Sequence, residues 1–189
     1  MPDSLKNSVE KLIASVKRNP KLANSVFRAS TYSDTTGFTV RSEIRGFTVP
    51  MDEPRELGGN DTAPNPVELL LAALGGCQEI VYRAFAAVLG VEISSIEVHA
   101  KGNLDLHGFL GLSDVPAGFS NISFTTRIVS PASPESISQL AVLVERHCPV
   151  QDTIARPVPV SCKVELLQPG DPAGAVEIVS TCGQSEAAG

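Results

Sequence analysis

Two of the four cysteines in the sequence stand where a thiol could do chemistry. Cys77 lies in the apolar segment 64–90, which is long enough for a helix of about six turns. Cys148 directly precedes a proline in "RHCPVQDTIARP". A free cysteine is also a small hydrophobe that packs well in a core, so each thiol is either a reactive group or an inert one.

The surroundings of Cys148 favour reactivity. Pro149 disfavours helical geometry at the preceding residue and is well placed to begin a short helix over residues 150–155. We therefore expect Cys148 at a helix N-terminus, where unpaired backbone N–H groups and the helix dipole stabilise a thiolate. The adjacent His147 either adds to this effect or lies on the surface, and we favour the surface.

The other two cysteines are expected to do no chemistry. Cys162 shares strand parity with Val160 and Val164, which predicts a core position. Cys182 lies in the C-terminal tail. None of the four belongs to a CxxC pair, so a structural zinc site has little support, and no static disulfide framework is expected in a reducing compartment.

Composition and charge limit the class of protein. The 189 residues include 15 basic and 21 acidic side chains, for a net charge of -6, and no Lys/Arg run is present that could follow a phosphate backbone. We expect no nucleic-acid partner. The first 20 residues resemble neither a secretory signal nor an Arg-rich transit peptide, which favours a cytoplasmic protein. Charged residues interrupt the Cys77 segment, so we expect a core helix and no membrane partner: Glu68, Glu79 and Arg83.

Hydrophobic periodicity and turn residues predict a domain of helices and antiparallel strands, residues 26–167, with a helical arm before it, residues 1–25, and a loosely ordered tail after it, residues 168–189. Asn65, Pro66 and Gly90 are suited to cap the Cys77 helix, and Glu68 lies in its first turn. The other expected helices are 4–16, 133–147 and 150–155, and the expected strands lie within 26–49, 94–112, 119–130 and 158–167.

Three stretches together resemble the OsmC/Ohr superfamily of osmotically inducible and organic hydroperoxide resistance proteins: "PNPVELLLAALGGC", "DLHGFLGL" and "CPV". The resemblance covers residues 26–166. It implies an α+β fold in which two central helices are packed against antiparallel sheets in an intertwined homodimer. It also implies a peroxidase without metal, flavin or heme, in which Cys77 attacks an organic hydroperoxide and Cys148 resolves the resulting sulfenic acid. A dithiol, in some relatives a lipoylated protein, is the implied reductant.

The sequence departs from the superfamily pattern at the charged groups around the thiol. Organic hydroperoxide resistance proteins usually carry an arginine in the turn after the first strand, whereas the turn here reads "SDTTG". The usual glutamate is displaced by one position, to Glu68. Arg55, in the loop before the Cys77 helix, is our candidate for stabilising the thiolate, with Glu68 orienting it. The competing interpretation is a non-enzymatic relative that binds a small lipophilic ligand or senses oxidation.

Overall fold

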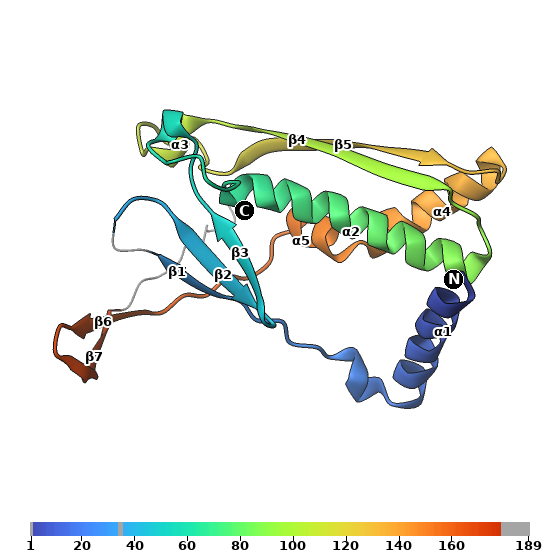
Figure 1. Cartoon of the computed structure of the whole chain (residues 1–189), viewed down its shortest axis with the longest axis horizontal. Coiled ribbons are helices and arrows are strands. Elements are labelled where there is room, and N and C mark those ends of the chain that lie inside the picture. The colour runs from blue at the N-terminus through green and yellow to red at the C-terminus, as the bar shows by residue number, and fades with distance from the viewer. Residues whose placement is uncertain (1, 34–35, 179–189) are drawn as a thin grey trace, which may run out of the picture. The chain divides into compact units, whose positions relative to one another are not determined.

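A computed structural model describes residues 2–33 and 36–178 of the chain, with side chains for residues 4–33 and 36–170. The chain divides into two compact units, Met1–Asp152 and Thr153–Gly189. The first unit contains two long helices and antiparallel strands, and it confirms the predicted α+β class (Figure 1). Cys182 lies outside the described residues.

The N-terminal arm is helical, as predicted. Helix α1 spans Pro2–Arg18 and is followed by a 3-10 helix, Pro20–Ala23, whose first free N–H is capped by the Asn19 side chain. Helix α1 contacts the helix that carries Cys77 (Figure 1).

A three-stranded antiparallel sheet follows the arm, with strands β1 (Ser30–Ser33), β2 (Val40–Ile44) and β3 (Phe47–Met51) in that order. The β2–β3 turn consists of Arg45 and Gly46, whose φ angles are both positive, 52° and 87°. This is the geometry of a two-residue hairpin turn that matches the twist of its strands. These strands lie largely within the segment 26–49 that the sequence predicts to contain strands.

Helix α2 spans Pro66–Leu89 and begins and ends at the predicted residues. The Asn65 side chain accepts a hydrogen bond from the Glu68 N–H, and the Glu68 carboxylate accepts one from the Asn65 N–H, which forms a capping box. Gly90 ends the helix with φ 71°. Among the described residues, α2 is the one helix long and apolar enough to cross a membrane, but it packs against strand β4 and helix α4 as a core helix.

Strands β4 (Ser95–Leu104) and β5 (Phe119–Val129) form an antiparallel hairpin along α2 (Figure 1). His99 is exposed on β4, with its Nε2 3.4 Å from Oε2 of Glu97. The expected strand 94–112 is wrong beyond Leu104. There, the Asp105 side chain caps a short helix α3, Leu106–Phe109, which turns the chain out of the sheet.

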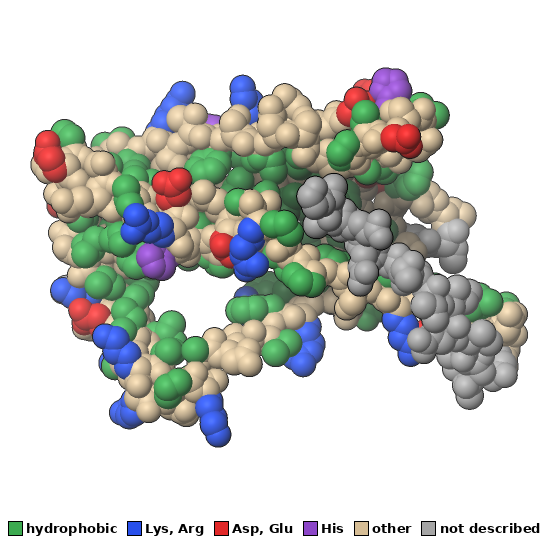
Figure 2. All heavy atoms as spheres, turned by 180° about the vertical axis from the view of Figure 1, so that it is seen from behind, with side chains coloured by type: hydrophobic (Ala, Val, Ile, Leu, Met, Phe, Trp, Pro, Cys, Tyr) green, Lys and Arg blue, Asp and Glu red, His purple; other side chains and the backbone are tan. Residues whose placement is uncertain are grey.

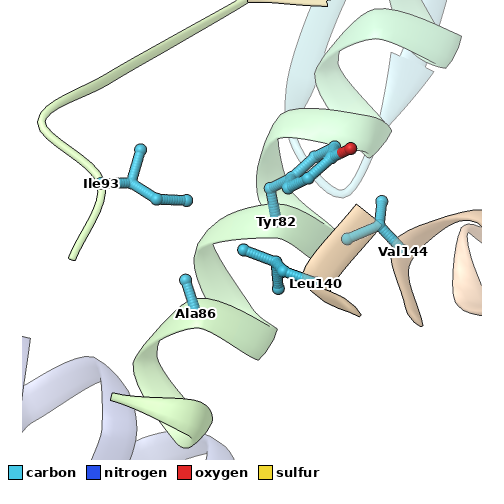
Figure 3. Close-up of a cluster of buried hydrophobic side chains, with 5 residues drawn as sticks. All are labelled: Tyr82, Ala86, Ile93, Leu140 and Val144. Carbon is cyan, nitrogen blue, oxygen red and sulfur yellow. The ribbon is translucent and has the colours of Figure 1, made fainter. Parts of the chain in front are cut away.

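Helix α4, Pro134–His147, supplies the other half of the core. Leu140 and Val144 are fully buried and face Tyr82 and Ala86 of α2, with Ile93 closing the cluster (Figure 3). The predicted helix 133–147 is confirmed, and its N-cap is Ser133, whose side chain accepts a hydrogen bond from the Ser136 N–H. Helix α5, Pro149–Ala155, follows after a single residue.

The second unit holds a hairpin of strands β6 (Val164–Gln168) and β7 (Asp171–Ile178). The predicted core position of Cys162 is wrong: this residue is exposed, lies before β6 and takes part in a disulfide bond. Pro157 and Pro159 lack the N–H groups that a strand there would need, so the expected strand 158–167 starts only at Val164. Strand β7 occupies part of the segment expected to be loosely ordered.

Candidate active site at the contact of helices α2 and α5

The fold brings the two predicted thiols into contact. Cys77 lies halfway along α2 and is half-buried, and Cys148 is fully buried. Cys148 ends one helix and begins another, since its N–H donates to Val144 O at 2.9 Å and its carbonyl accepts from Asp152 N–H at 3.0 Å. The predicted helix start at Cys148 is therefore confirmed.

Burial raises the pKa of the Cys77 thiol above its usual value. The Cys148 thiol, hydrogen-bonded to Cys77, raises it further, and a hydrogen bond from the Val150 backbone N–H opposes both effects. The N–H at the start of α5 thus acts on Cys77, across the contact between the helices. The net direction means that Cys77 of a single chain rests as a protonated thiol at neutral pH.

A glutamine pair lies beside the thiols. The Gln78 side chain donates from Nε2 to Oε1 of Gln151 at 2.6 Å. Gln78 follows Cys77 on α2 and is only 2% exposed, and Gln151 lies three residues after Cys148 on α5. Sequence analysis missed both residues, although a glutamine between Leu74 and Tyr82 on a buried helix face was a signal.

The two charged residues predicted at the site lie elsewhere in this chain. Glu68 is at the start of α2, where its carboxylate accepts the Asn65 N–H at 2.9 Å. Arg55 is exposed on a 3-10 helix, Arg55–Leu57, and within the described residues its side chain has no ion pair or hydrogen bond. Neither residue contributes to the pKa shift of Cys77. Their roles at the thiol stay predictions.

The loop that carries Arg55 into α2 is organised by Asp52, which sequence analysis did not single out. Asp52 is buried, and its carboxylate accepts the N–H groups of Glu53, Asn60 and Thr62 and the Thr62 hydroxyl, at 2.8–3.2 Å. The Thr62 hydroxyl bond is the largest of the effects that lower the pKa of Asp52. The charged Asp52 carboxylate therefore holds the conformation of the loop that precedes the Cys77 helix.

The two glycines before Cys77 lie in different surroundings. Gly75 is buried against β4, where an added Cβ would lie 3.7 Å from Val98. Gly76 faces open space. Beside it lies a surface depression of about 740 Å³ between α2 and β4, with apolar Leu69 and Leu71 among its lining residues and Glu68, Glu79 and His99 as its polar ones.

His147 is a surface residue, as favoured from the sequence. Its Nδ1 donates to Leu143 O at 2.7 Å, and its ring packs on Phe85 with centroids 5.3 Å apart. In the described parts of the chain no three His, Cys, Asp or Glu side chains are grouped as metal ligands.

The sequence matches the family described as OsmC-like protein over residues 58–163, which is more than half of the chain and includes both thiols. The chain belongs to this family. Its fold is similar to that of an OsmC-like protein from Mycoplasma pneumoniae, with a TM-score of 0.61 and 17% identity over 70% of this chain and 89% of the other. A search of curated proteins found no match.

Other solved OsmC-like structures carry functional names. An organic hydroperoxide resistance protein from Legionella pneumophila, also described as a predicted redox protein, has a TM-score of 0.54 and 20% identity, over 69% of this chain and 89% of the other. A putative organic hydroperoxide resistance protein from Vibrio cholerae, with captopril bound in one of its active sites, has a TM-score of 0.52 and 19% identity, over 69% and 86%. At these identities the likeness establishes the shared fold.

Proposed function

We propose that this OsmC-like protein is a cytoplasmic, thiol-dependent peroxidase that reduces organic hydroperoxides. The observation that carries the proposal is the contact between the Cys77 and Cys148 thiols, from helices about 70 residues apart in sequence. Only one of the two sulfurs has access to solvent, since Cys77 is half-buried and Cys148 is fully buried. This asymmetry suits an attacking thiol and a resolving thiol.

The proposed reaction has three balanced steps. The Cys77 thiolate attacks the O–O bond of ROOH, which gives the Cys77 sulfenic acid and, after protonation of the leaving oxygen, ROH. The Cys148 thiol then displaces the sulfenic oxygen as water, and an S–S bond forms. A dithiol reductant, for which a lipoylated protein is our candidate, restores both thiols and leaves as its own disulfide.

The first step needs a thiolate, and the raised pKa of Cys77 opposes it. We assign the stabilising charge to Arg55, oriented by Glu68, because Arg55 is exposed on the loop that leads into α2 and has no side-chain partner within the described residues. With the other three cysteines replaced by Ser, Arg55→Ala should raise the pKa of Cys77 by about one unit. Arg127→Ala, an exposed arginine on β5, is the control. If the parent protein, Arg55→Ala and Arg127→Ala give identical titrations of the Cys77 thiolate, Arg55 does not stabilise it. Arg28, Arg41 and Arg45 are then the candidates.

We also propose that two chains form a homodimer. Exposed apolar residues on α2 lie at helical spacing around Cys77, with Leu70 at 39% and Ile80 at 70% exposure. Hydrophobic side chains are also exposed between scattered charges on the face drawn in Figure 2. A second copy covering the α2 face would remove this apolar surface from water and narrow the access to Cys77.

A second candidate function is non-enzymatic binding of a lipophilic ligand, or sensing of oxidation. The raised pKa of Cys77 and the depression beside Gly76 favour it. Turnover separates the two candidates. With cumene hydroperoxide and excess dihydrolipoamide, the peroxidase consumes many equivalents per chain, and Cys77→Ser consumes none. Consumption of a single equivalent under dihydrolipoamide, dithiothreitol and thioredoxin alike would overturn the peroxidase proposal.

A further inference from the structure

The glutamine pair is a direct polar link between α2 and α5. The Gln78–Gln151 bond is short, at 2.6 Å, and one of its partners is almost fully buried. A buried amide left without a partner is costly, so each glutamine holds the other in place. The pair lies one residue from Cys77 and three from Cys148.

Helix α5 is short, and the glutamine pair lies near its start. It is seven residues long and contains no fully buried residue, whereas α4 is anchored by Leu140 and Val144. Burial of apolar side chains is therefore greater on α4 than on α5. Yet the start of α5 must stay in place, because it carries the Val150 N–H that reaches Cys77 and follows directly on Cys148.

We propose that Gln78 and Gln151 are positioning residues that hold the start of α5 against α2, so that the Cys148 sulfur meets the Cys77 sulfur. The proposal rests on the proposed function, because it assigns the pair to the resolving step of that reaction. A disulfide requires an S–S distance of about 2.05 Å and a restricted range of dihedral angles. A directional amide bond restricts helix sliding in a way that an apolar contact does not.

The neutral amide also suits this position. A carboxylate beside Cys77 would disfavour the thiolate by charge repulsion, and an ammonium group would pair with the thiolate and compete with resolution. The pair therefore acts on the approach of the two sulfurs. It speeds the conversion of the Cys77 sulfenic acid and the Cys148 thiol into a disulfide and water.

The test compares Gln78→Met, Gln151→Met and the double variant with wild type. Gln139→Met, on the exposed side of α4, is the matched control for the substitution itself. The protein is equilibrated with reduced and oxidised glutathione in the absence of peroxide. The Cys77 and Cys148 thiols and GSSG then exchange with the Cys77–Cys148 disulfide and two GSH. The equilibrium constant of this exchange gives the effective concentration of the Cys148 thiol toward Cys77. The thermal stability of each variant is measured as well.

We expect each single variant to lower this effective concentration about tenfold or more and the control to leave it unchanged. A variant with lower thermal stability but a wild-type effective concentration would show a purely structural pair and overturn the proposal. Since Gln78 is nearly buried, Gln151→Met, at a half-buried position, keeps the test decisive if Gln78→Met folds poorly.

A second readout follows the resolving step itself. After one equivalent of cumene hydroperoxide, Gln151→Met should yield several-fold more dimedone adduct of the Cys77 sulfenic acid than wild type. An unchanged adduct yield would count against the glutamine pair. If wild type forms no sulfenic acid at all, the peroxidase proposal fails, and the glutathione titration alone decides the role of the pair.

Discussion

The two faces of helix α2 have opposite surroundings. One face, with Leu74, Gln78, Tyr82 and Ala86 at a spacing of four residues, is buried against the rest of the first unit. Another face, with Ala73 and Ile80, is exposed although it is apolar. Cys77 belongs to the exposed face by helical spacing and reaches Cys148 on the buried side.

One face of α2 therefore contributes to the stability of the fold, and the other is available for the proposed reaction and dimer contact. The buried face supplies the packing that stabilises the fold and carries the glutamine that meets α5. The exposed face supplies apolar surface that nothing in a single chain requires. Cys77, the attacking thiol of the proposed mechanism, lies at the border of the two faces and is half-buried.

The largest effect is expected on the buried side. Val144→Ala removes a fully buried side chain from the contact with α2, and we expect a loss of about 2 kcal/mol in the free energy of unfolding. Val142→Ala makes the same change on the same helix at a residue that is 44% exposed, and should cost under about 0.5 kcal/mol. Urea denaturation measures both, and equal losses would refute the division between the faces.

The next effect concerns the exposed face. Ile80→Glu places a charge on the proposed dimer surface and should weaken dimerisation at least tenfold, with little change in the fold of each chain. Leu112→Glu, at 67% exposure outside α2, is the control and should leave the dimer intact. Light scattering that gives wild type a mass near the 19.9 kDa of one chain at micromolar concentration would contradict the dimer.

The smallest effect is the pH dependence of stability. Because folding raises the pKa of Cys77, the folded state favours its protonated thiol. The resulting stabilisation is present in full below the unfolded pKa, about 8.5, and is lost as pH rises through the higher folded value. The free energy of unfolding of the reduced protein should therefore fall more steeply above this pH than that of Cys77→Ser. Parallel curves would show that folding leaves this thiol unperturbed.

Local signals in the sequence predicted the elements that depend on local chemistry. Asn65, Pro66 and Gly90 define the ends of α2 through caps that act within one turn, and Pro149 indicated both the end of α4 and the start of α5. The same signals favoured a reactive Cys148, and resemblance to a family indicated Cys77. The structure places these two thiols in contact, and their roles stay predictions.

Features set by the tertiary surroundings were missed. Strand parity placed Cys162 in a core, but no strand forms there, and "DLHGFLGL" alternates like a strand although Asp105 caps a helical turn. The pairing of Gln78 with Gln151 joins residues 73 positions apart, which a single sequence cannot indicate. The pKa direction of Cys77 likewise depends on burial and on groups from another helix.

The central claim is that Cys77 and Cys148 act as one redox pair. Fully reduced protein is treated with one equivalent of cumene hydroperoxide, and its peptides are mapped by mass spectrometry. We predict a product lighter by the two thiol hydrogens, with Cys77 joined to Cys148, and in Cys148→Ser a Cys77 sulfenic acid that dimedone traps. A bond from Cys77 to Cys162 or Cys182, or peroxide consumption that neither Cys77→Ser nor Cys148→Ser slows, would contradict the account.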